Sequence, residues 1–219
     1  MAFHLENHTI SYGDVNILNN INLSIQKGDK VALLGRSGSG KSTLIKNLFD
    51  IQKENSSYIP QELGLVNNLS IFHNVYISLL NEKSTFYNIR NFIKPVKTEL
   101  QNVEAILEKL FLKEKVFSKV TNLSGGQKQR TAIARSLNSN KSILIADEPI
   151  SALDENLSQI TMDVLNDKFE TIVCALHNVE LALQNFDRVI GLSNGCIVLD
   201  KKSCDITRED TSTLYAVCE

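Results

Sequence analysis

A short glycine-rich segment carries the first chemical signal in this sequence. Residues 35–42 fit the pattern G-x-x-x-x-G-K-[ST]. Glycines let such a loop turn its backbone N–H groups toward an anion, and the helix that follows adds its positive end. In this pattern Lys41 would reach the β- and γ-phosphates of a nucleotide, and the Ser42 hydroxyl would sit on Mg²⁺. We therefore predict a phosphate site formed by Gly35, Arg36, Ser37, Gly38, Ser39, Gly40, Lys41, Ser42 and Thr43.

Two acidic residues and one histidine lie at the ends of apolar runs. Residues 142–146 read as a buried parallel strand that ends in Asp147 and Glu148, and His177 ends a second such run 30 residues after Asp147. Ligands of parallel sheets bind at the carboxyl ends of the strands, so these side chains are expected beside the phosphate loop. Asp147 is suited to hold Mg²⁺ through water, Glu148 to orient and polarise an attacking water, and His177 to lie near the γ-phosphate.

The elements that must position these residues predict an α/β fold. Apolar runs at 31–34, 142–146 and 171–176 favour a mainly parallel sheet. With the loop at 35–42, this sheet resembles the core of RecA-like phosphate-loop proteins. Alternation within residues 1–34 favours a small antiparallel N-terminal β-subdomain. Residues 70–120 lack glycine and repeat at helical spacing. We predict one domain of 219 residues, with a helical subdomain inserted at about 67–122 whose apolar stripe serves internal packing.

Composition and charge argue against some classes of binding partner and cellular location. The net charge of −2 gives no electrostatic case for a nucleic-acid partner. No apolar run reaches the length of a membrane span, and the N-terminus lacks the layout of a signal peptide. The four cysteines show no C-x-x-C spacing and are interpreted as reduced cytosolic thiols: Cys174, Cys196, Cys204 and Cys218.

A second glycine-bearing motif lies at residues 123–127, Leu-Ser-Gly-Gly-Gln. Ser124 and Gln127 fit a capping box that opens a helix. A capping box does not require Gly125 and Gly126, whose bare backbone would let an anion approach the helix end closely.

Together these motifs resemble the nucleotide-binding subunits of ABC transporters, over nearly the whole chain. The motif at 123–127 matches the family signature, which would act on the ATP of a partner copy. The resemblance implies that Asp147 is the Walker B aspartate, Glu148 the catalytic glutamate and His177 the switch histidine. It also implies adenine stacking by Tyr12, which spacing alone leaves equally open to simple packing. Gln61 would contact Mg²⁺ and sense the membrane subunits, and residues 151–154 match the D-loop, which brings Asp154 to the nucleotide.

The resemblance also predicts partners and location. It implies an ATP-hydrolysing dimer that binds ATP and Mg²⁺, works with integral membrane permease subunits and a solute-binding protein, and lies peripherally on the cytoplasmic face of the membrane. Residues 65–75, 176–192 and 205–215 are similar to phosphonate importer ATPases. One departure is that Gln61 follows Lys41 by only 20 residues. Strands that the family normally places there should be missing or reduced.

Three alternatives remain at this stage. A soluble ABC-type ATPase without a transporter usually carries long insertions, coiled coils or two cassettes, none of which is found in this sequence. A phosphate-loop kinase of small molecules would not need the motif at 123–127. A regulator that binds nucleotide without hydrolysis would not need both Asp147 and Glu148.

Overall fold

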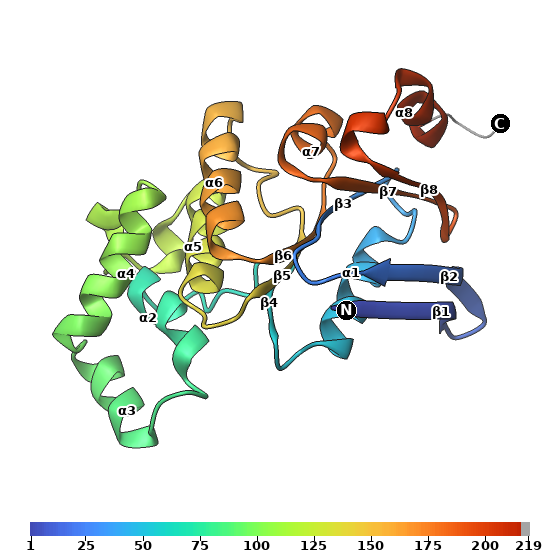
Figure 1. The fold of residues 1–219 in the computed structure, drawn as a ribbon. Coiled ribbons are helices and arrows are strands. Elements are labelled where there is room, and N and C mark those ends of the chain that lie inside the picture. Colours follow the sequence, from blue (N-terminus) through green and yellow to red (C-terminus); the bar gives the residue numbers. More distant parts are fainter. Residues whose placement is uncertain (216–219) are drawn as a thin grey trace. The chain divides into compact units, whose positions relative to one another are not determined.

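The computed structural model describes residues 1–215, apart from the side chain of Tyr12. The chain divides into two compact units (Figure 1). The first unit comprises residues 1–61, 142–151 and the chain from 169 onward, and the second comprises 62–141 and 152–168.

The first unit is built on a sheet of six strands. Five strands are parallel and the edge strand β8 is antiparallel to β7. Both β5 and β6 are buried along their whole length, as expected for strands covered on both faces. The predicted mainly parallel sheet is therefore confirmed. In spatial order the strands are β4 (Ser56–Ile59), β5 (Ile143–Asp147), β6 (Thr171–Ala175), β3 (Lys30–Leu34), β7 (Arg188–Ser193) and β8 (Cys196–Lys202).

The N-terminal strands form a separate antiparallel pair, also as predicted. Strand β1 (Phe3–Tyr12) pairs with β2 (Val15–Ile25), and they lie side by side in Figure 1. In the second half of β2, buried and more exposed positions alternate, so that one face is apolar. That face joins the core that also buries α1 (Lys41–Ile51) and the central sheet.

The rest of the first unit closes around β7 and β8. Helix α7 (Val179–Asn185) precedes β7, while η4 (Ser203–Asp205) and α8 (Arg208–Tyr215) follow β8. Strands β7 and β8 form an antiparallel hairpin. Between Lys41 and Gln61 the structure has only α1 and β4 as regular elements, in line with the short spacing noted in the sequence.

The second unit is helical. Helix α2 packs on α4 and α5, and α4 buries Val103 and Leu107, so the predicted internal packing of this stripe is confirmed. The inserted helical segment is thus present, while its predicted limits at 67–122 stay a prediction. Its elements are α2 (Ile71–Tyr76), η1 (Ile77–Leu79), α3 (Thr85–Ile93), α4 (Lys97–Lys109), η2 (Lys113–Lys115), η3 (Val120–Asn122), α5 (Gly125–Leu137) and α6 (Glu155–Lys168).

The structure bears on the expectations about membrane spans and cysteines. Within residues 1–215, no helix has the length and apolar character that a bilayer crossing needs. Cys174, Cys196 and Cys204 are free thiols, whereas Cys218 lies outside the described residues.

Candidate functional site

The phosphate loop follows β3 directly and ends where α1 begins. Gly35 and Gly40 have φ angles of 149° and 103°, a backbone region that favours glycine. Close packing excludes a side chain as well, because a Cβ on Gly35 would lie 2.3 Å from the carbonyl oxygen of Leu192. A Cβ on Gly40 would lie 2.6 Å from the side chain of Leu18. Both backbone conformation and space therefore favour glycine at these two positions.

Lys41 lies at the centre of this loop. Its Nζ donates hydrogen bonds to the carbonyl oxygens of Gly35, at 2.8 Å, and Arg36, at 3.0 Å. Burial lowers the pKa of Lys41, and the negative charges of Glu148 and Asp147 partly oppose that shift. The ammonium group thus holds the loop in shape and places a positive charge where a phosphate would bind.

Asp147 ends β5 and is almost fully buried. The Ser42 hydroxyl donates to its carboxylate, and that bond lowers the pKa of Asp147, but burial is the larger influence and raises it. Among residues 1–215, Oδ1 of Asp147 has no hydrogen-bond partner. A buried carboxylate oxygen without a partner costs free energy unless a cation or an ordered water satisfies it. Asp147 and Ser42 therefore fit a Mg²⁺ site.

The raised pKa predicts a gain in stability when this charge is removed. The folded protein holds the Asp147 proton at higher pH than the unfolded chain does. Free energy of unfolding is therefore lost as pH rises from the ordinary aspartate pKa of 3.8 through the raised pKa of the folded state. Above that pH window the buried carboxylate destabilises the fold. We expect Asp147→Asn, measured without nucleotide at pH 8, to raise the melting temperature by about 2–4 °C per kcal/mol relieved. An unchanged or lower melting temperature would contradict this cost of burial.

Glu148 and His177 meet at the same edge of the sheet. The His177 Nε2 atom lies 2.6 Å from Oε1 of Glu148, so the structure brings together the two residues that the 30-residue spacing placed there. The His177 side chain is half exposed, whereas that of Glu148 is 15% exposed. Glu148 has a φ of 53°, and its backbone N–H donates to the carbonyl oxygen of Ala175 at 3.1 Å. A bulky residue in this conformation is strained, and such strain concentrates at functional sites.

A hairpin turn far along the chain supports the phosphate loop. The N–H of Gly195 donates to the carbonyl oxygen of Ser39 at 3.2 Å, and the N–H of Asn19 in β2 donates to that of Gly195 at 2.8 Å. A Cβ on Gly195 would lie 2.3 Å from the carbonyl oxygen of Ile17. In the sequence, Asn194-Gly195 is a common turn dipeptide, which does not reveal which segment the turn will contact.

Two predicted nucleotide contacts are only partly described. Gln61 is exposed in a turn two residues after β4, and β4 runs parallel to β5 with Ile59 opposite Ala146. Gln61 therefore lies at the strand edge that also carries Asp147. Tyr12 ends β1 opposite Val15, but its side chain lies outside the described part of the chain, so its predicted stacking on adenine stays a prediction.

In the second unit, the motif at 124–127 opens helix α5. The Ser124 hydroxyl accepts from the N–H of Gln127, and the Gln127 side chain accepts from the N–H of Ser124, which confirms the capping box. The two glycines differ. A Cβ on Gly125 would meet nothing within 4 Å in the described chain, whereas one on Gly126 would lie 2.9 Å from the carbonyl oxygen of Ala152. Gly126 is therefore required for packing within this unit, and packing does not explain Gly125.

The segment that begins at Ala152 is held against α5 by a second contact. The N–H of Ala152 donates to Oε1 of Gln129 at 2.8 Å. Asp154, predicted to contact nucleotide, accepts from the N–H of Leu157 at 2.9 Å and so caps the start of α6. Sequence reasoning missed Gln129, because nothing local distinguishes a buried helix glutamine that bonds a distant backbone group from an exposed one.

Substitutions at Gly125 and Gly126 test whether each glycine is needed for folding or for binding a ligand. We expect Gly126→Ala to lower the melting temperature, because its methyl group collides with Ala152. Gly125→Ala should leave the melting temperature within about 1–2 °C of the original, since small surface changes cost little. If Gly125 faces a nucleotide, Gly125→Ala should nevertheless slow ATP hydrolysis at least about tenfold. Full activity in Gly125→Ala would remove the ligand role of Gly125.

Comparison with known proteins identifies the family to which this chain belongs. A family model described as ABC transporter matches residues 18–151. The phosphonates import ATP-binding protein PhnC of Fusobacterium nucleatum subsp. nucleatum is 34% identical over 96% of this chain and 96% of that protein. PhnC of Mesoplasma florum is 36% identical over 91% of this chain and 93% of that protein. The dimeric ATP-binding cassette MJ0796, solved in a post-hydrolysis state with ADP and Pi, superposes with a TM-score of 0.76, at 27% identity over 91% of this chain and 98% of that one.

Proposed function

The chain belongs to the ABC transporter family, and from that premise we propose that it is the ATP-binding and ATP-hydrolysing subunit of an importer of phosphonate or a related small anion. The names of its relatives in Fusobacterium nucleatum and Mesoplasma florum support the substrate class, since both proteins align over nine-tenths or more of this chain. The alternative of a soluble ABC-type ATPase without a transporter is not favoured by these relatives.

One observation carries the catalytic part of this proposal. The first unit gathers Lys41, Ser42, Asp147, Glu148 and His177 at one edge of its sheet, through the contacts and charges given above. Hydrolysis of a nucleoside triphosphate requires this set of groups: a phosphate loop with a cation, a buried carboxylate bonded to Ser42, and a second carboxylate beside a histidine.

Each of these residues has a role in hydrolysis. Lys41 and the loop N–H groups bind the β- and γ-phosphates. Ser42, Asp147 and Gln61 would hold Mg²⁺, which would neutralise phosphate charge. Glu148 accepts a hydrogen bond from the attacking water and orients it toward the γ-phosphorus. The water oxygen bonds to that phosphorus while the bond from the phosphorus to the bridging oxygen breaks. The water gives a proton to Glu148, and ADP and inorganic phosphate leave. His177 holds Glu148 in place and faces the γ-phosphate.

The complete site requires a second copy of the chain. Ser124, Gly125, Gly126 and Gln127, together with Asp154, belong to the second unit and would cover the ATP held by the phosphate loop of the partner copy. Two chains would then enclose two ATP molecules in an isologous dimer. The dimeric state of the related cassette MJ0796 with ADP and Pi supports this arrangement. Closure of the dimer would exclude water other than the nucleophile.

The import role adds membrane partners. The dimer would bind integral permease subunits at the cytoplasmic face of the membrane, and a solute-binding protein would deliver the anion on the other side. Gln61 and the helical unit would pass the opening and closing of the dimer to the permease.

Co-purification and stimulation together test the transport role. The tagged chain, expressed in its own host and extracted from membranes in mild detergent, should bring down an integral membrane protein. ATP hydrolysis by that complex should rise at least about tenfold when a solute-binding protein loaded with an alkylphosphonate is added, because the loaded protein favours the closed dimer. A chain that hydrolyses ATP and never associates with a membrane protein would instead support the soluble ATPase. Stimulation by other solutes alone would exclude phosphonate.

A further inference from the structure

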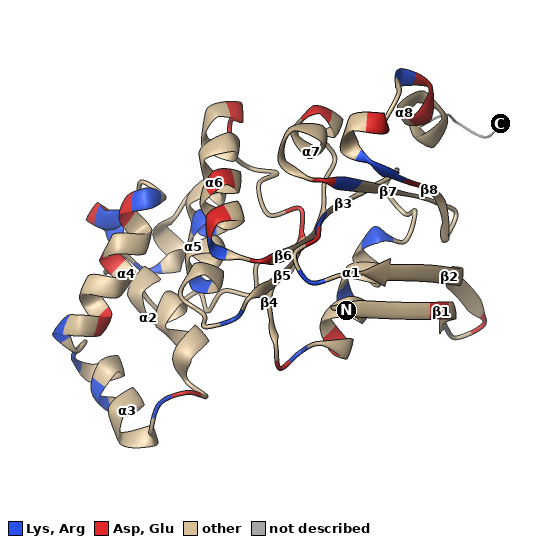
Figure 2. Cartoon of the chain, in the orientation of Figure 1, with Lys and Arg blue, Asp and Glu red and all other residues tan. Residues whose placement is uncertain are grey.

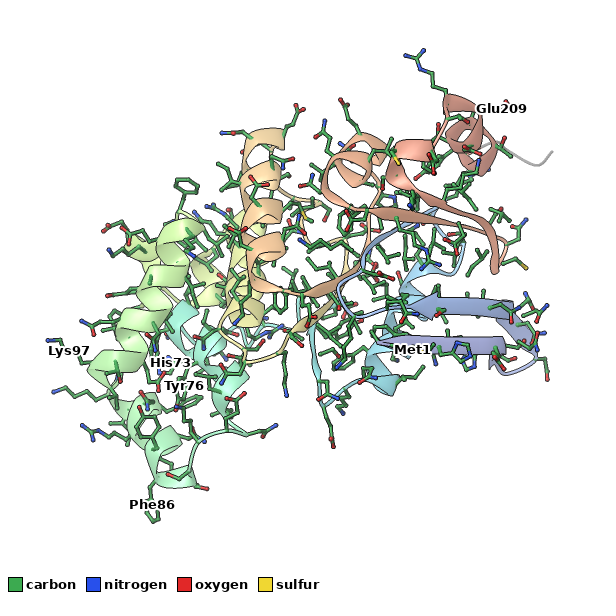
Figure 3. All side chains as sticks on the ribbon, viewed as in Figure 1. Met1, His73, Tyr76, Phe86, Lys97 and Glu209 are labelled. Carbon is green, nitrogen blue, oxygen red and sulfur yellow. The ribbon has the colours of Figure 1, made fainter. Side chains whose placement is uncertain are left out.

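Helix α3 presents an apolar face that nothing in the second unit covers. Phe86, Ile89 and Ile93 are spaced to share one face of a helix, and they are 88%, 52% and 81% exposed. Figure 3 shows Phe86 at the outer end of α3, pointing away from His73 and Tyr76. Single exposed apolar residues are ordinary, but three large ones on a single short helix mark an interaction surface.

This exposure does not come from loose packing, because the opposite side of α3 is well anchored. The Tyr76 hydroxyl donates to Oδ1 of Asn88 at 2.8 Å, and the Asn88 amide donates to the carbonyl oxygens of Leu80 and Lys83. The Phe92 ring lies 5.1 Å from the ring of His73. The helix is therefore fixed with its apolar face outward.

Basic residues surround that face. Residues 83–98 contain four cations and no acidic residue, although the whole chain has a net charge of −2. Arg90, Lys94 and Lys97 are exposed, and Figure 2 shows Lys and Arg but no Asp or Glu along α3. The neighbouring acids are engaged elsewhere: Glu99 is buried, lies 3.6 Å from Lys83 and accepts from Tyr87, and Glu82 accepts from Asn140.

We propose that this surface, defined as Phe86, Ile89, Ile93, Arg90, Lys94 and Lys97, binds directly to an anionic lipid bilayer. An apolar strip flanked by Lys and Arg is the pattern of helices that lie in a membrane interface. The cytoplasmic leaflet is negatively charged, so these cations gain free energy there. The cytoplasmic loops of membrane proteins are rich in Lys and Arg, which would repel a cationic surface, so lipid is favoured over a permease loop.

The contact would be weak alone. Three apolar side chains on a helix of nine residues and three cations give a reversible interaction that is lost at high salt. Such a contact would orient the subunit on the membrane and would not depend on ATP hydrolysis.

Vesicle co-sedimentation of the full-length chain tests this proposal. The chain should bind vesicles of equal parts phosphatidylglycerol and phosphatidylcholine, and should not bind phosphatidylcholine alone. Arg90→Gln/Lys94→Gln/Lys97→Gln should lower the partition coefficient about tenfold or more, because each cation near an anionic surface contributes to binding. Phe86→Ser/Ile93→Ser should lower it by a similar factor through lost apolar burial. Both variants should keep the circular dichroism spectrum and the ATP hydrolysis rate in solution.

Matched control variants distinguish binding by this surface from nonspecific binding through charge or exposed apolar residues elsewhere. Lys27→Gln/Lys53→Gln/Lys168→Gln removes three exposed cations elsewhere, and Ile51→Ser/Val198→Ser removes two exposed apolar residues elsewhere. Both control variants should bind vesicles as the original chain does. The proposal is overturned if anionic vesicles bind no better than neutral ones, if the α3 variants bind normally, or if the controls lose as much. It is also overturned if binding in neutral lipid requires reconstituted permease and is lost in the α3 variants, which would assign the surface to protein.

Discussion

Replacement of Glu148 by Gln should nearly stop ATP hydrolysis while leaving ATP binding intact. In the original chain the His177 Nε2 atom lies 2.6 Å from Oε1 of Glu148. Glutamine keeps the shape of this side chain and its contact with His177, but it cannot accept a proton from water. Loss of a general base at this position costs about 10²–10⁴ in rate. Phosphate release at saturating ATP measures the loss.

The same variant should accumulate as an ATP-bound dimer. If hydrolysis opens the dimer, blocking hydrolysis holds it closed, and size-exclusion chromatography with ATP and Mg²⁺ should then show twice the monomer mass. Glu209→Gln, which changes an exposed glutamate on α8, is the matched control and should remain indistinguishable from the original chain. An unchanged hydrolysis rate in Glu148→Gln would refute the role assigned to Glu148.

Replacement of Lys41 by Ala should weaken ATP binding by about 10–100-fold. The variant loses a cation within the phosphate loop, and hydrogen bonds to charged groups contribute about 1.5–3 kcal/mol each. It also leaves the carbonyl oxygens of Gly35 and Arg36 without their 2.8 and 3.0 Å donor. The dissociation constant of a fluorescent ATP analogue, measured by titration, gives the size of the effect.

A second lysine on the same helix supplies the control for this loss. Lys46 is exposed on α1, and Lys46→Ala removes an equal charge from the surface. Its ATP affinity should change less than about threefold, since exposed charges act weakly through solvent. Equal losses in the two variants would mean that overall charge, and not the loop geometry, governs binding. Unaffected binding in Lys41→Ala would remove the phosphate-loop assignment.

The sequence predicted the sheet, and the edge at which Glu148 and His177 meet, because these features depend on local pattern. A fully apolar run followed by Asp147 and Glu148 has few readings other than a buried parallel strand. The 30 residues from Asp147 to His177 allow one strand–helix–strand crossover, and parallel strands end at the same edge. The contact between Glu148 and His177 follows from that connection.

Features that depend on contacts between distant segments could not be predicted in this way. Nothing around residue 126 indicates that the carbonyl oxygen of Ala152 lies against it, and the positive φ of Glu148 has no signature in its neighbours. The helical spacing within residues 70–120 predicts internal packing but does not indicate that α3 forms a separate helix with an exposed apolar face. Phe86 and Ile93 follow the same helical spacing as buried residues, and only the fold shows which side of α3 is covered.

The turn at Gly195 has a consequence for how this protein tolerates substitution. One peptide unit there is bonded both to Ser39 in the phosphate loop and to Asn19 in β2, and Ile17 leaves no room for a side chain. A deep mutational scan should therefore find Gly195 as intolerant as the loop glycines, although it lies outside every recognised motif. Tolerance to substitution in this chain should therefore follow the spatial support of the phosphate loop and not the borders of the motifs alone.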